Sequence, residues 1–325
     1  MNHVKKAKHT LVFICFLHFS VSSFILNQTE ESMDCVEEAR LDLSKVLVEN
    51  GYDLCDARLL GRGRYSDVCE GIQINSHMKV AIKVVDKRKV PHVYRSKFLP
   101  REISCWRRLR HINIVTLIAV IESRHFVVMV MELSEKGDLL TWVQKNGPQS
   151  EKVAATWMKQ VMSAVCYMHT HSIAHRDLKM ENALLFTNDK VKIADFGFTR
   201  RATVNDLSFS FCGSKSYSAP EILLGDAYSP FKADIWAIGV MTFVAITNRM
   251  PFSERNVTNE QLVRSQFHRK YRQCYPNELS ISSDCRDAID ILLTFNYARR
   301  PNIREAMSIP WFSRSERVEM KAPNR

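Results

Sequence analysis

Five short segments of the chain carry residues that could act on a phosphorylated ligand. The first two are Gly61-Arg-Gly63-Arg-Tyr-Ser66 and Val80-Ala-Ile-Lys83, and the later three are His175-Arg-Asp-Leu-Lys-Met-Glu-Asn182, Asp195-Phe-Gly197 and Ala219-Pro-Glu221. Glycines let phosphate groups approach the backbone with no side chain in the way. Alone, the glycine turn indicates only a tight hairpin and the lysine only a solvated strand edge. Together and in this order, the segments are very unlikely to arise by chance.

The elements that must position these residues follow from the periodicity of the chain. Short apolar runs between polar turns predict strands over residues 59–60, 68–74, 79–85 and 126–133. Helical spacing predicts helices over residues 39–48, 94–110 and 151–171, and residues 233–247 are apolar enough for a helix buried on every side. A β-rich first third followed by a helical remainder predicts an α+β chain with two lobes and a cleft between them.

Composition places the chain among globular proteins. Of its 325 residues, 46% are hydrophobic and 25% are charged, which is not the balance of a disordered chain. The net charge of +11 favours acidic or phosphate-bearing partners without specifying a function. The nine cysteines form no CxxC pair, so they fit reduced thiols better than a zinc site or a disulfide framework.

The N-terminus gives the opposite signal about the cellular compartment. Three lysines precede an apolar run over residues 11–19 and then small residues, as in a secretory signal peptide. The alternative is an upstream extension over residues 1–32, with Met33 as a second initiator. We expect no stable membrane insertion, because the apolar run is short and contains His18.

From residue 52 to residue 312 the chain resembles a eukaryotic protein kinase, on the strength of the five segments above. Lys179 after His-Arg-Asp-Leu resembles the serine/threonine kinases rather than the tyrosine kinases. Further segments, over residues 133–140, 211–214 and 234–240, are similar to the testis-specific serine kinase family of the calcium/calmodulin-kinase-like group.

The resemblance implies a bilobal protein kinase fold with an ATP cleft between the lobes. The small β-rich N-lobe would cover about residues 52–133, and the larger α-helical C-lobe about residues 134–312. Residues 33–51 would be an acidic lead-in and residues 313–325 a charged tail.

The same resemblance implies transfer of the γ-phosphoryl group of ATP to serine or threonine of protein substrates, with Mg²⁺ or Mn²⁺ as cofactor. This reaction needs alignment and charge neutralisation more than covalent help. Asp177 would accept or orient the proton of the substrate hydroxyl, and Lys179 would neutralise charge on the transferring group. Asp195 and Asn182 would hold the metal through oxygen ligands.

A larger set of residues would bind the nucleotide by resemblance. Lys83 would hold the α- and β-phosphates and be oriented by an ion pair to Glu102. Met131 would be a bulky gatekeeper, and Ser66 replaces the third glycine of the family. The complete set is Leu60, Gly61, Gly63, Ser66, Val68, Ala81, Lys83, Glu102, Met131, Glu132, Leu133, Asp138 and Leu184.

Other residues would support or switch the site. Phe196 would join a hydrophobic spine with His175 and Trp106, Asp234 would brace the catalytic loop, and Glu221 would form a buried salt bridge with Arg300. Arg176 would pair with a phosphate on Ser210, added by an upstream kinase or by autophosphorylation, with Ser208 as a rival acceptor. Ser214 would contact Asp177 and Lys179.

Several partner classes can be weighed from the sequence. Asp138 and Glu181 match positions that face basic residues upstream of the target in related kinases; alternatively, Asp138 meets the ribose and Glu181 is a solvated charge. The basic cluster over residues 87–110 has no interleaved aromatic residues, so we expect no nucleic-acid partner. The neighbouring His169 and His171 lack a carboxylate or a cysteine that would complete a metal site.

Two alternatives to a cytoplasmic kinase stay open. A pseudokinase would bind nucleotide without turnover, but such proteins usually lack the lysine, the catalytic aspartate or the metal aspartate, and all three are present here. A secreted kinase would use the N-terminal signal, with Asn27 and Asn256 as glycosylation acceptors. We expect a cytoplasmic kinase, with a role in spermatogenesis implied by the family resemblance only.

Overall fold

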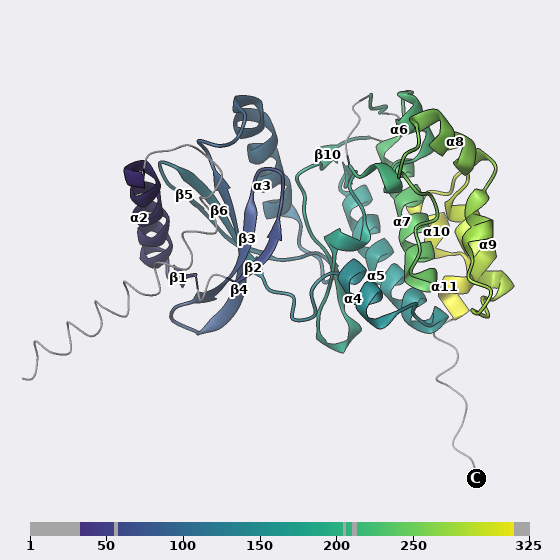
Figure 1. The fold of residues 1–325 in the computed structure, drawn as a ribbon, viewed down its shortest axis with the longest axis horizontal. Helices are drawn as coiled ribbons and strands as arrows, with labels where there is room; N and C mark the ends of the chain where they lie inside the picture. Colours follow the sequence, from purple (N-terminus) through teal and green to yellow (C-terminus); the bar gives the residue numbers. More distant parts are fainter. Residues whose placement is uncertain (1–32, 55–57, 204–205, 210–212, 315–325) are drawn as a thin grey trace, which may run out of the picture. The chain divides into compact units, whose positions relative to one another are not determined.

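The computed structural model describes residues 33–54, 58–203, 206–209 and 213–314 (Figure 1). These residues form two compact units. Unit 1 contains the described residues up to Pro100 together with Thr116–Leu133, and unit 2 contains Arg101–Val115 together with the described residues from Ser134 onward. The chain therefore enters unit 2 briefly, returns to unit 1 and then completes unit 2.

Unit 1 is built on an antiparallel sheet. The strand order is β1-β3-β4-β6-β5, and β2 pairs with β3. The strands are β1 (Tyr52–Asp53), β2 (Leu59–Arg62), β3 (Asp67–Gln73), β4 (Met78–Asp86), β5 (Leu117–Glu122) and β6 (Phe126–Glu132). The predictions from periodicity located β2, β3, β4 and β6 but missed β1 and β5.

Helix α2 (Met33–Glu49) covers one face of this sheet. Leu43 and Leu47 are buried in a core cluster whose strand residues are Tyr52, Val80, Ile82, Val84, Ile121, Phe126, Val128 and Val130. The side chain of Ser123 also donates a hydrogen bond of 2.9 Å to the Asp42 carboxylate. The helix begins six residues before the predicted span of residues 39–48.

The segment predicted as one helix over residues 94–110 has two parts. A π-helical turn over Tyr94–Phe98 leads into α3 (Leu99–Arg108). Helix α3 passes from unit 1 into unit 2 after Pro100. It carries Glu102 on its buried side, while Arg101, Arg107 and Arg108 are exposed.

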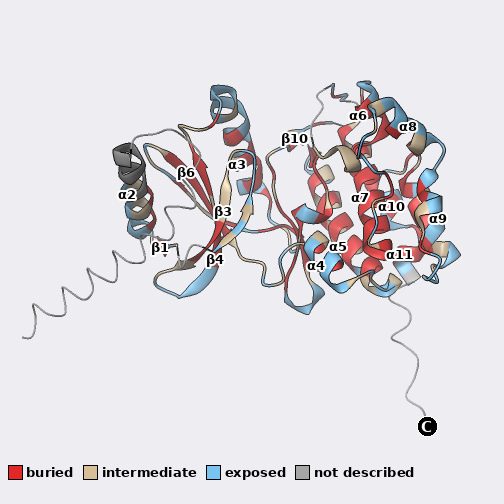
Figure 2. Cartoon of the chain, viewed as in Figure 1, coloured by how far each residue is buried: buried red, intermediate tan, exposed pale blue. Residues whose placement is uncertain are grey.

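Unit 2 is mostly helical, and α5 and α7 lie at its centre (Figure 2). Its α-helices besides α3 are α4 (Leu139–Asn146), α5 (Glu151–Thr170), α6 (Pro220–Leu224), α7 (Pro230–Thr247), α8 (Asn259–Phe267), α9 (Ser283–Leu292), α10 (Ile303–Met307) and α11 (Pro310–Arg314). Two small antiparallel sheets pair β7 (Ile173–Ala174) with β10 (Arg200–Arg201) and β8 (Ala183–Leu185) with β9 (Val191–Ile193). A β-sheet followed by a helical region confirms the predicted α+β class.

Helix α7 is buried on all sides, as the sequence predicted. Among the described helices it alone is long and apolar enough to cross a membrane, but 89% of its apolar window is buried inside the protein. Burial of this kind is what the central helix of a globular fold requires.

Free thiols are found at Cys69, Cys105, Cys166, Cys274 and Cys285. Burial raises the pKa of Cys69 to about 11, so this thiol is a poor nucleophile at neutral pH.

Candidate active site

One face of the sheet in unit 1 gathers several residues of the expected nucleotide set. Val68 on β3 lies directly opposite Lys83 on β4, and Ala81 on β4 lies opposite Met131 on β6. Gly61 on β2 lies opposite Val68. Directly opposed residues share a face and side chains alternate along a strand, so these five positions face the same side. That side is the one opposite to α2, because Val80, Ile82 and Val84 of β4 pack in the cluster beneath the helix.

The glycine turn closes between β2 and β3. The Gly63 N–H donates a hydrogen bond of 2.7 Å to the Ser66 backbone oxygen. A Cβ on Gly63 would lie 3.1 Å from the Ser66 Oγ, so Ser66 fills the space beside this glycine. The turn is therefore still tight, although Ser66 stands where the family has its third glycine. Leu60 lies on β2 and is exposed.

The last members of the nucleotide set in unit 1 are Glu132 and Leu133. The Glu132 N–H donates a hydrogen bond of 3.2 Å to the Thr116 oxygen, and its side chain accepts one of 2.6 Å from the Thr116 N–H. Glu132 thus fixes the end of β6 at the point where the chain leaves unit 1.

In unit 2, polar side chains converge on the buried carboxylate of Asp177. The Lys179 Nζ lies 3.1 Å from Oδ2, and the Asn182 Nδ2 donates to the same oxygen over 3.1 Å. The Ser214 N–H donates to Oδ1 over 3.1 Å, and the Lys179 Nζ donates to the Ser214 Oγ over 3.2 Å. Asp177, Lys179, Asn182 and Ser214 therefore form one hydrogen-bonded group.

Asp234 of α7 fixes the backbone just before Asp177 through hydrogen bonds. The two carboxylate oxygens accept hydrogen bonds from the N–H groups of His175 (2.9 Å) and Arg176 (2.8 Å). The His169 Nε2 lies 2.9 Å from Oδ2 of the same carboxylate. Asp234 is 1% exposed, so these bonds act where water competes little. The core helix of unit 2 thereby fixes the loop that presents Asp177.

Two residues of the catalytic segments adopt left-handed backbone conformations that L-amino acids rarely take. Arg176 has a φ of 67° and Asp195 a φ of 60°. Such residues cost of order 1–3 kcal/mol each and cluster at functional sites. Both residues belong to the segments that are expected to carry the chemistry, although further non-glycine residues of the described chain share this conformation.

The residues expected to bind a metal suit Mg²⁺ by their chemistry. The Asn182 Nδ2 uses its hydrogens on the Asp177 backbone oxygen (2.8 Å) and carboxylate, so the amide oxygen is the atom that the side chain has for a cation. Asp195 supplies a carboxylate. Within the described part of the chain, no group of three or more His, Cys, Asp or Glu side chains is arranged to hold a metal. Two oxygen ligands from the protein fit an ion that usually takes its others from water and phosphates.

Phe196 lies between two aromatic side chains of unit 2. Its ring centroid is 5.3 Å from that of Trp106 on α3 and 5.6 Å from that of His175. The Trp106 Nε1 donates a hydrogen bond of 2.7 Å to the Val115 oxygen. The residues expected to form a spine are thus in contact, and the tryptophan keeps its polar atom satisfied.

Glu102 is also brought close to this segment. A Cβ built on Gly197 would lie 3.4 Å from the Glu102 Oε2 and 3.4 Å from the Asp195 Oδ1. The carboxylate of α3 therefore borders the Asp-Phe-Gly turn. Lys83 lies in unit 1 and Glu102 in unit 2. The ion pair that the family resemblance implies between them stays a prediction.

Asp138 and Glu181, the two acidic residues that are expected to face a substrate, lie near the buried Tyr217. The Tyr217 hydroxyl donates a hydrogen bond of 3.3 Å to the Glu181 carboxylate. Asp138 caps α4 by accepting bonds of 2.8 Å from both the N–H and the Oγ1 of Thr141, and it bridges to Leu184. Burial raises the pKa of Tyr217, and the charges of Glu181 and Asp138 raise it further.

Glu221 and Arg300 form a bidentate ion pair. The guanidinium Nη1 and Nη2 lie 2.8 and 3.0 Å from the two carboxylate oxygens. Arg300 is 1% exposed, and its remaining donors reach the backbone oxygens of Thr294, Lys232 and Phe295. The pair joins α6 to the chain before α10 and has no place in the chemistry.

The proposed phosphorylation site, Ser210, lies outside the described residues. Its rival Ser208 is fully buried, and its backbone exchanges two hydrogen bonds with Tyr228 (2.8 and 3.0 Å). A kinase could not reach the Ser208 hydroxyl in this conformation. Arg176 donates a hydrogen bond of 2.8 Å from Nε to the Phe198 oxygen.

Sequence reasoning missed the contact between His169 and Asp234 and the role of Tyr217. Both join residues far apart in the chain, at separations of 65 and 36 residues. No metal site was expected at the neighbouring histidines, and the contact of His169 with the Asp234 carboxylate of α7 was not foreseen. The sequence contains no local signal for either contact.

Comparison with known proteins gives a consistent result. A protein kinase domain model matches residues 55–312. The chain is 37% identical over 270 residues to human "Testis-specific serine/threonine-protein kinase 3", covering 82% of this chain and 98% of that protein. It is 34% identical over 279 residues to the human kinase 4 of the same name, with 81% and 83% covered. It is 35% identical over 277 residues to the mouse kinase 1, with 83% and 74% covered.

Proposed function

The chain belongs to the protein kinase family and is a serine/threonine protein kinase that uses ATP, and from this premise we propose how its residues divide the work. Asp177 accepts or orients the proton of the substrate hydroxyl, which raises the nucleophilicity of its oxygen. Lys179 neutralises negative charge as the γ-phosphoryl group moves.

The observation that supports this assignment is the group around Asp177. Four hydrogen-bonding partners fix its carboxylate in a buried position, namely Lys179, Asn182 and the N–H and hydroxyl of Ser214. A base held in one orientation needs no rearrangement during the reaction. The ammonium of Lys179 lies between the carboxylate and the Ser214 hydroxyl, within reach of a group that binds there.

The family resemblance supports the following assignments for the nucleotide and its metal. In unit 1 we assign the glycine turn to the phosphates, Lys83 to the α- and β-phosphates, and the apolar face formed by Val68, Ala81 and Met131 to the adenine. In unit 2 we assign Asn182 and Asp195 to Mg²⁺, which when bound offsets phosphate charge.

Transfer of radiolabelled phosphate from ATP to a protein substrate tests the assignment, with protein purified from Met33 onward. We expect Asp177→Asn, Lys83→Met and Asp195→Ala each to lower kcat at least about a hundredfold, because each removes a charge that acts on the reacting groups. Asp226→Asn is the matched control, since Asp226 is an exposed aspartate beyond α6. Its turnover should equal that of the unchanged protein.

The same assay separates an active enzyme from a pseudokinase. A pseudokinase would bind ATP with no transfer above the Asp177→Asn background. Retention of more than a few per cent of turnover by Asp195→Ala would argue for another metal arrangement. The presence of Lys83, Asp177 and Asp195 favours turnover.

We further propose that the substrate carries arginine or lysine upstream of its target residue. Asp138 and Glu181 set up a local negative potential beside Tyr217 in a chain whose net charge is +11. Arginine can pair with a carboxylate through two hydrogen bonds, which makes such a patch selective.

A peptide library measured with the Glu181→Gln variant tests this preference. The amide can still accept from the Tyr217 hydroxyl, so only the charge is lost. We expect selection for upstream arginine to fall several-fold while kcat on peptides without arginine stays the same. No selection for basic residues by the unchanged enzyme would sink the proposal.

For the site of action we propose the cytoplasm and, from the names of its relatives, a role in male germ cells. The described glycosylation sequon places Asn256 on an exposed turn, and its Thr258 caps α8. Endoglycosidase treatment of protein from expressing cells should cause no mass shift. A shift would indicate the secretory pathway, and equal transcript levels in all tissues would contradict the germ-cell role.

A further inference from the structure

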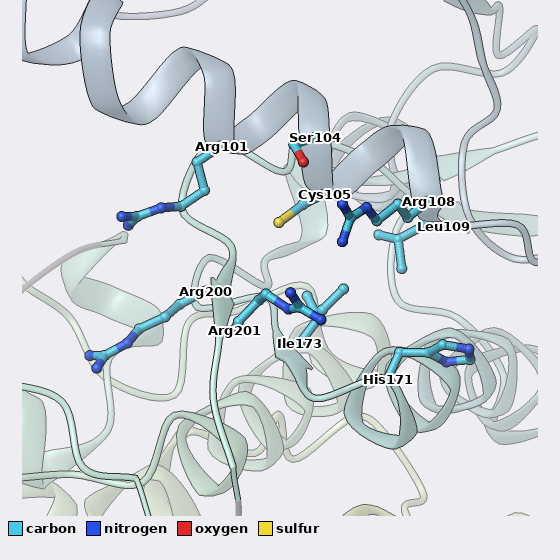
Figure 3. A pocket seen from close by; sticks show the side chains of 9 residues that line it. All are labelled: Arg101, Ser104, Cys105, Arg108, Leu109, His171, Ile173, Arg200 and Arg201. Carbon is cyan, nitrogen blue, oxygen red and sulfur yellow. The ribbon is translucent and has the colours of Figure 1, made fainter.

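Unit 2 contains a cavity of about 410 Å³ that the proposed reaction does not use. Helix α3 forms one wall, and the opposite wall comes from the end of α5, β7 and β10 (Figure 3). The lining residues are Arg101, Ser104, Cys105, Arg108, Leu109, His171, Ile173, Arg200 and Arg201. Cavities of this size are typical of small-molecule sites.

The cavity concentrates positive charge with no lining carboxylate. Four of its nine lining residues are arginines, and a histidine stands beside them. In the part of the chain that the structure describes, none of these four guanidinium groups forms an ion pair. Asp206 has a coulombic interaction with Arg200. Its carboxylate accepts a hydrogen bond from the Thr203 N–H and does not line the cavity.

The spacing of the arginines suits more than one anionic group. Arg101 and Arg108 lie seven residues apart on one face of α3, which is about 10 Å along a helix. Arg200 and Arg201 are consecutive in β10, opposite Ala174 and Ile173 of β7. In Figure 3, Arg101 and Arg200 occupy one side of the view, while Arg108 and Arg201 lie nearer its centre. The arginines thus form a row, with Arg101 and Arg200 at one end and Arg108 and Arg201 at the other. One phosphate could not contact both ends.

We propose that the cavity binds a small ligand with at least two phosphate groups. Guanidinium groups pair with phosphate through two parallel hydrogen bonds, so each end of the row can hold one phosphate. Leu109 and Ile173 give the carbon skeleton of the ligand an apolar surface. Arg176, assigned to a phosphate on Ser210, does not line this cavity.

Binding here would join two elements that border the proposed active site. Helix α3 carries Glu102 beside Gly197, and β10 follows the Asp-Phe-Gly turn after two residues. A ligand that bridges Arg108 and Arg201 ties these elements together. The site is therefore placed to regulate the kinase without touching the reacting groups.

Isothermal calorimetry on the phosphatase-treated full chain tests the proposal, with inositol hexakisphosphate as the probe. A non-hydrolysable ATP analogue saturates the nucleotide site, and the ionic strength is about 0.15 M to screen weak surface binding. We expect one saturable site. The double variant Arg108→Ala/Arg201→Ala should bind at least about a hundredfold more weakly, since each lost charge-assisted contact costs about tenfold.

Arg107→Ala is the matched control, because Arg107 belongs to the same helical turn, is exposed and does not line the cavity. Its affinity should be unchanged, and all variants should unfold at the same temperature without the probe. The proposal would be overturned by the absence of saturable binding or by an equal loss of affinity in Arg107→Ala and the double variant. It would also be overturned if the probe bound only when the ATP analogue was left out. So would tight binding of a phosphoserine peptide with none of the inositol phosphate.

Discussion

At the scale of single residues, Gly213 sets the geometry around Asp177. Its φ of 88° lies in the left-handed region, and a Cβ there would come within 2.8 Å of the Arg176 backbone oxygen. The next residue, Ser214, donates from its N–H to the Asp177 carboxylate. A side chain at position 213 would therefore displace the segment that contains Ser214 from the segment that contains Arg176 and Asp177.

We predict that Gly213→Ala lowers kcat at least about tenfold through this displacement, in addition to a backbone strain of about 1–3 kcal/mol. Gly225→Ala is the control, because Gly225 has a φ of 77° but no atom within 4 Å of its would-be Cβ. It shares the strain without the collision. Kinase assays and thermal unfolding of both variants decide the question: equal losses of turnover would show that strain alone is responsible.

At the scale of elements, the segment from Asp195 to Glu221 connects the catalytic group to the helical core. Its start is fixed by β10 against β7, and Ser208 is fixed by its bridge to Tyr228. Its end is fixed by Ser214 at Asp177 and by Glu221 at Arg300. With four anchors along one segment, the conformation between them is sensitive to a charge that is added there.

We predict that phosphorylation of Ser210 activates the enzyme. The phosphate would add about −1.5 to −2 charges and pair with Arg176, next to Asp177. Ser210→Ala should lower activity, and Arg176→Ala should lower the activity of phosphorylated enzyme much more than that of unphosphorylated enzyme. Full activity of Ser210→Ala, or active enzyme without phosphate on residues 208–210 by mass spectrometry, would refute this switch.

At the scale of the whole molecule, the folded part of the chain begins before the residues that match the family model. The kinase domain model begins at residue 55, whereas α2 lies before it and buries Leu43 and Leu47 against the sheet of unit 1. We predict that Leu47→Ala destabilises the protein by about 2–5 kcal/mol, the usual cost of a cavity in a core. Val48→Ala, at a side chain that is 51% exposed, should cost less than about 0.5 kcal/mol.

Urea unfolding of both variants measures the difference. Equal midpoints would show that α2 rests on the sheet without contributing to its stability. Kinase activity of folded Leu47→Ala should be retained, because α2 covers the face of the sheet that is opposite to Val68, Lys83 and Ala81.

The sequence predicted local features better than long-range ones. The roles of Asp177, Lys179, Asn182 and Asp195 were predicted from the family resemblance of their motifs and stay predictions, while the structure brings the first three into one hydrogen-bonded group. Helix α2 was predicted too short, since the apolar spacing that indicates a helix starts only at residue 39, whereas the helix begins at Met33. Strand β1 was missed because it has two residues, too few to show a period. The basic cavity draws on segments about 100 residues apart, and no spacing in the sequence indicates that they meet.

The brace formed by Asp234 has a consequence for the dynamics of the active loop. The amide protons of His175 and Arg176 are bonded to a carboxylate that belongs to the most deeply buried helix of unit 2. Solvent can reach them only when that helix separates from the loop, which is close to global unfolding. Their hydrogen–deuterium exchange should be as slow as that of α7 itself, so the loop that performs the chemistry belongs to the most rigid part of its unit.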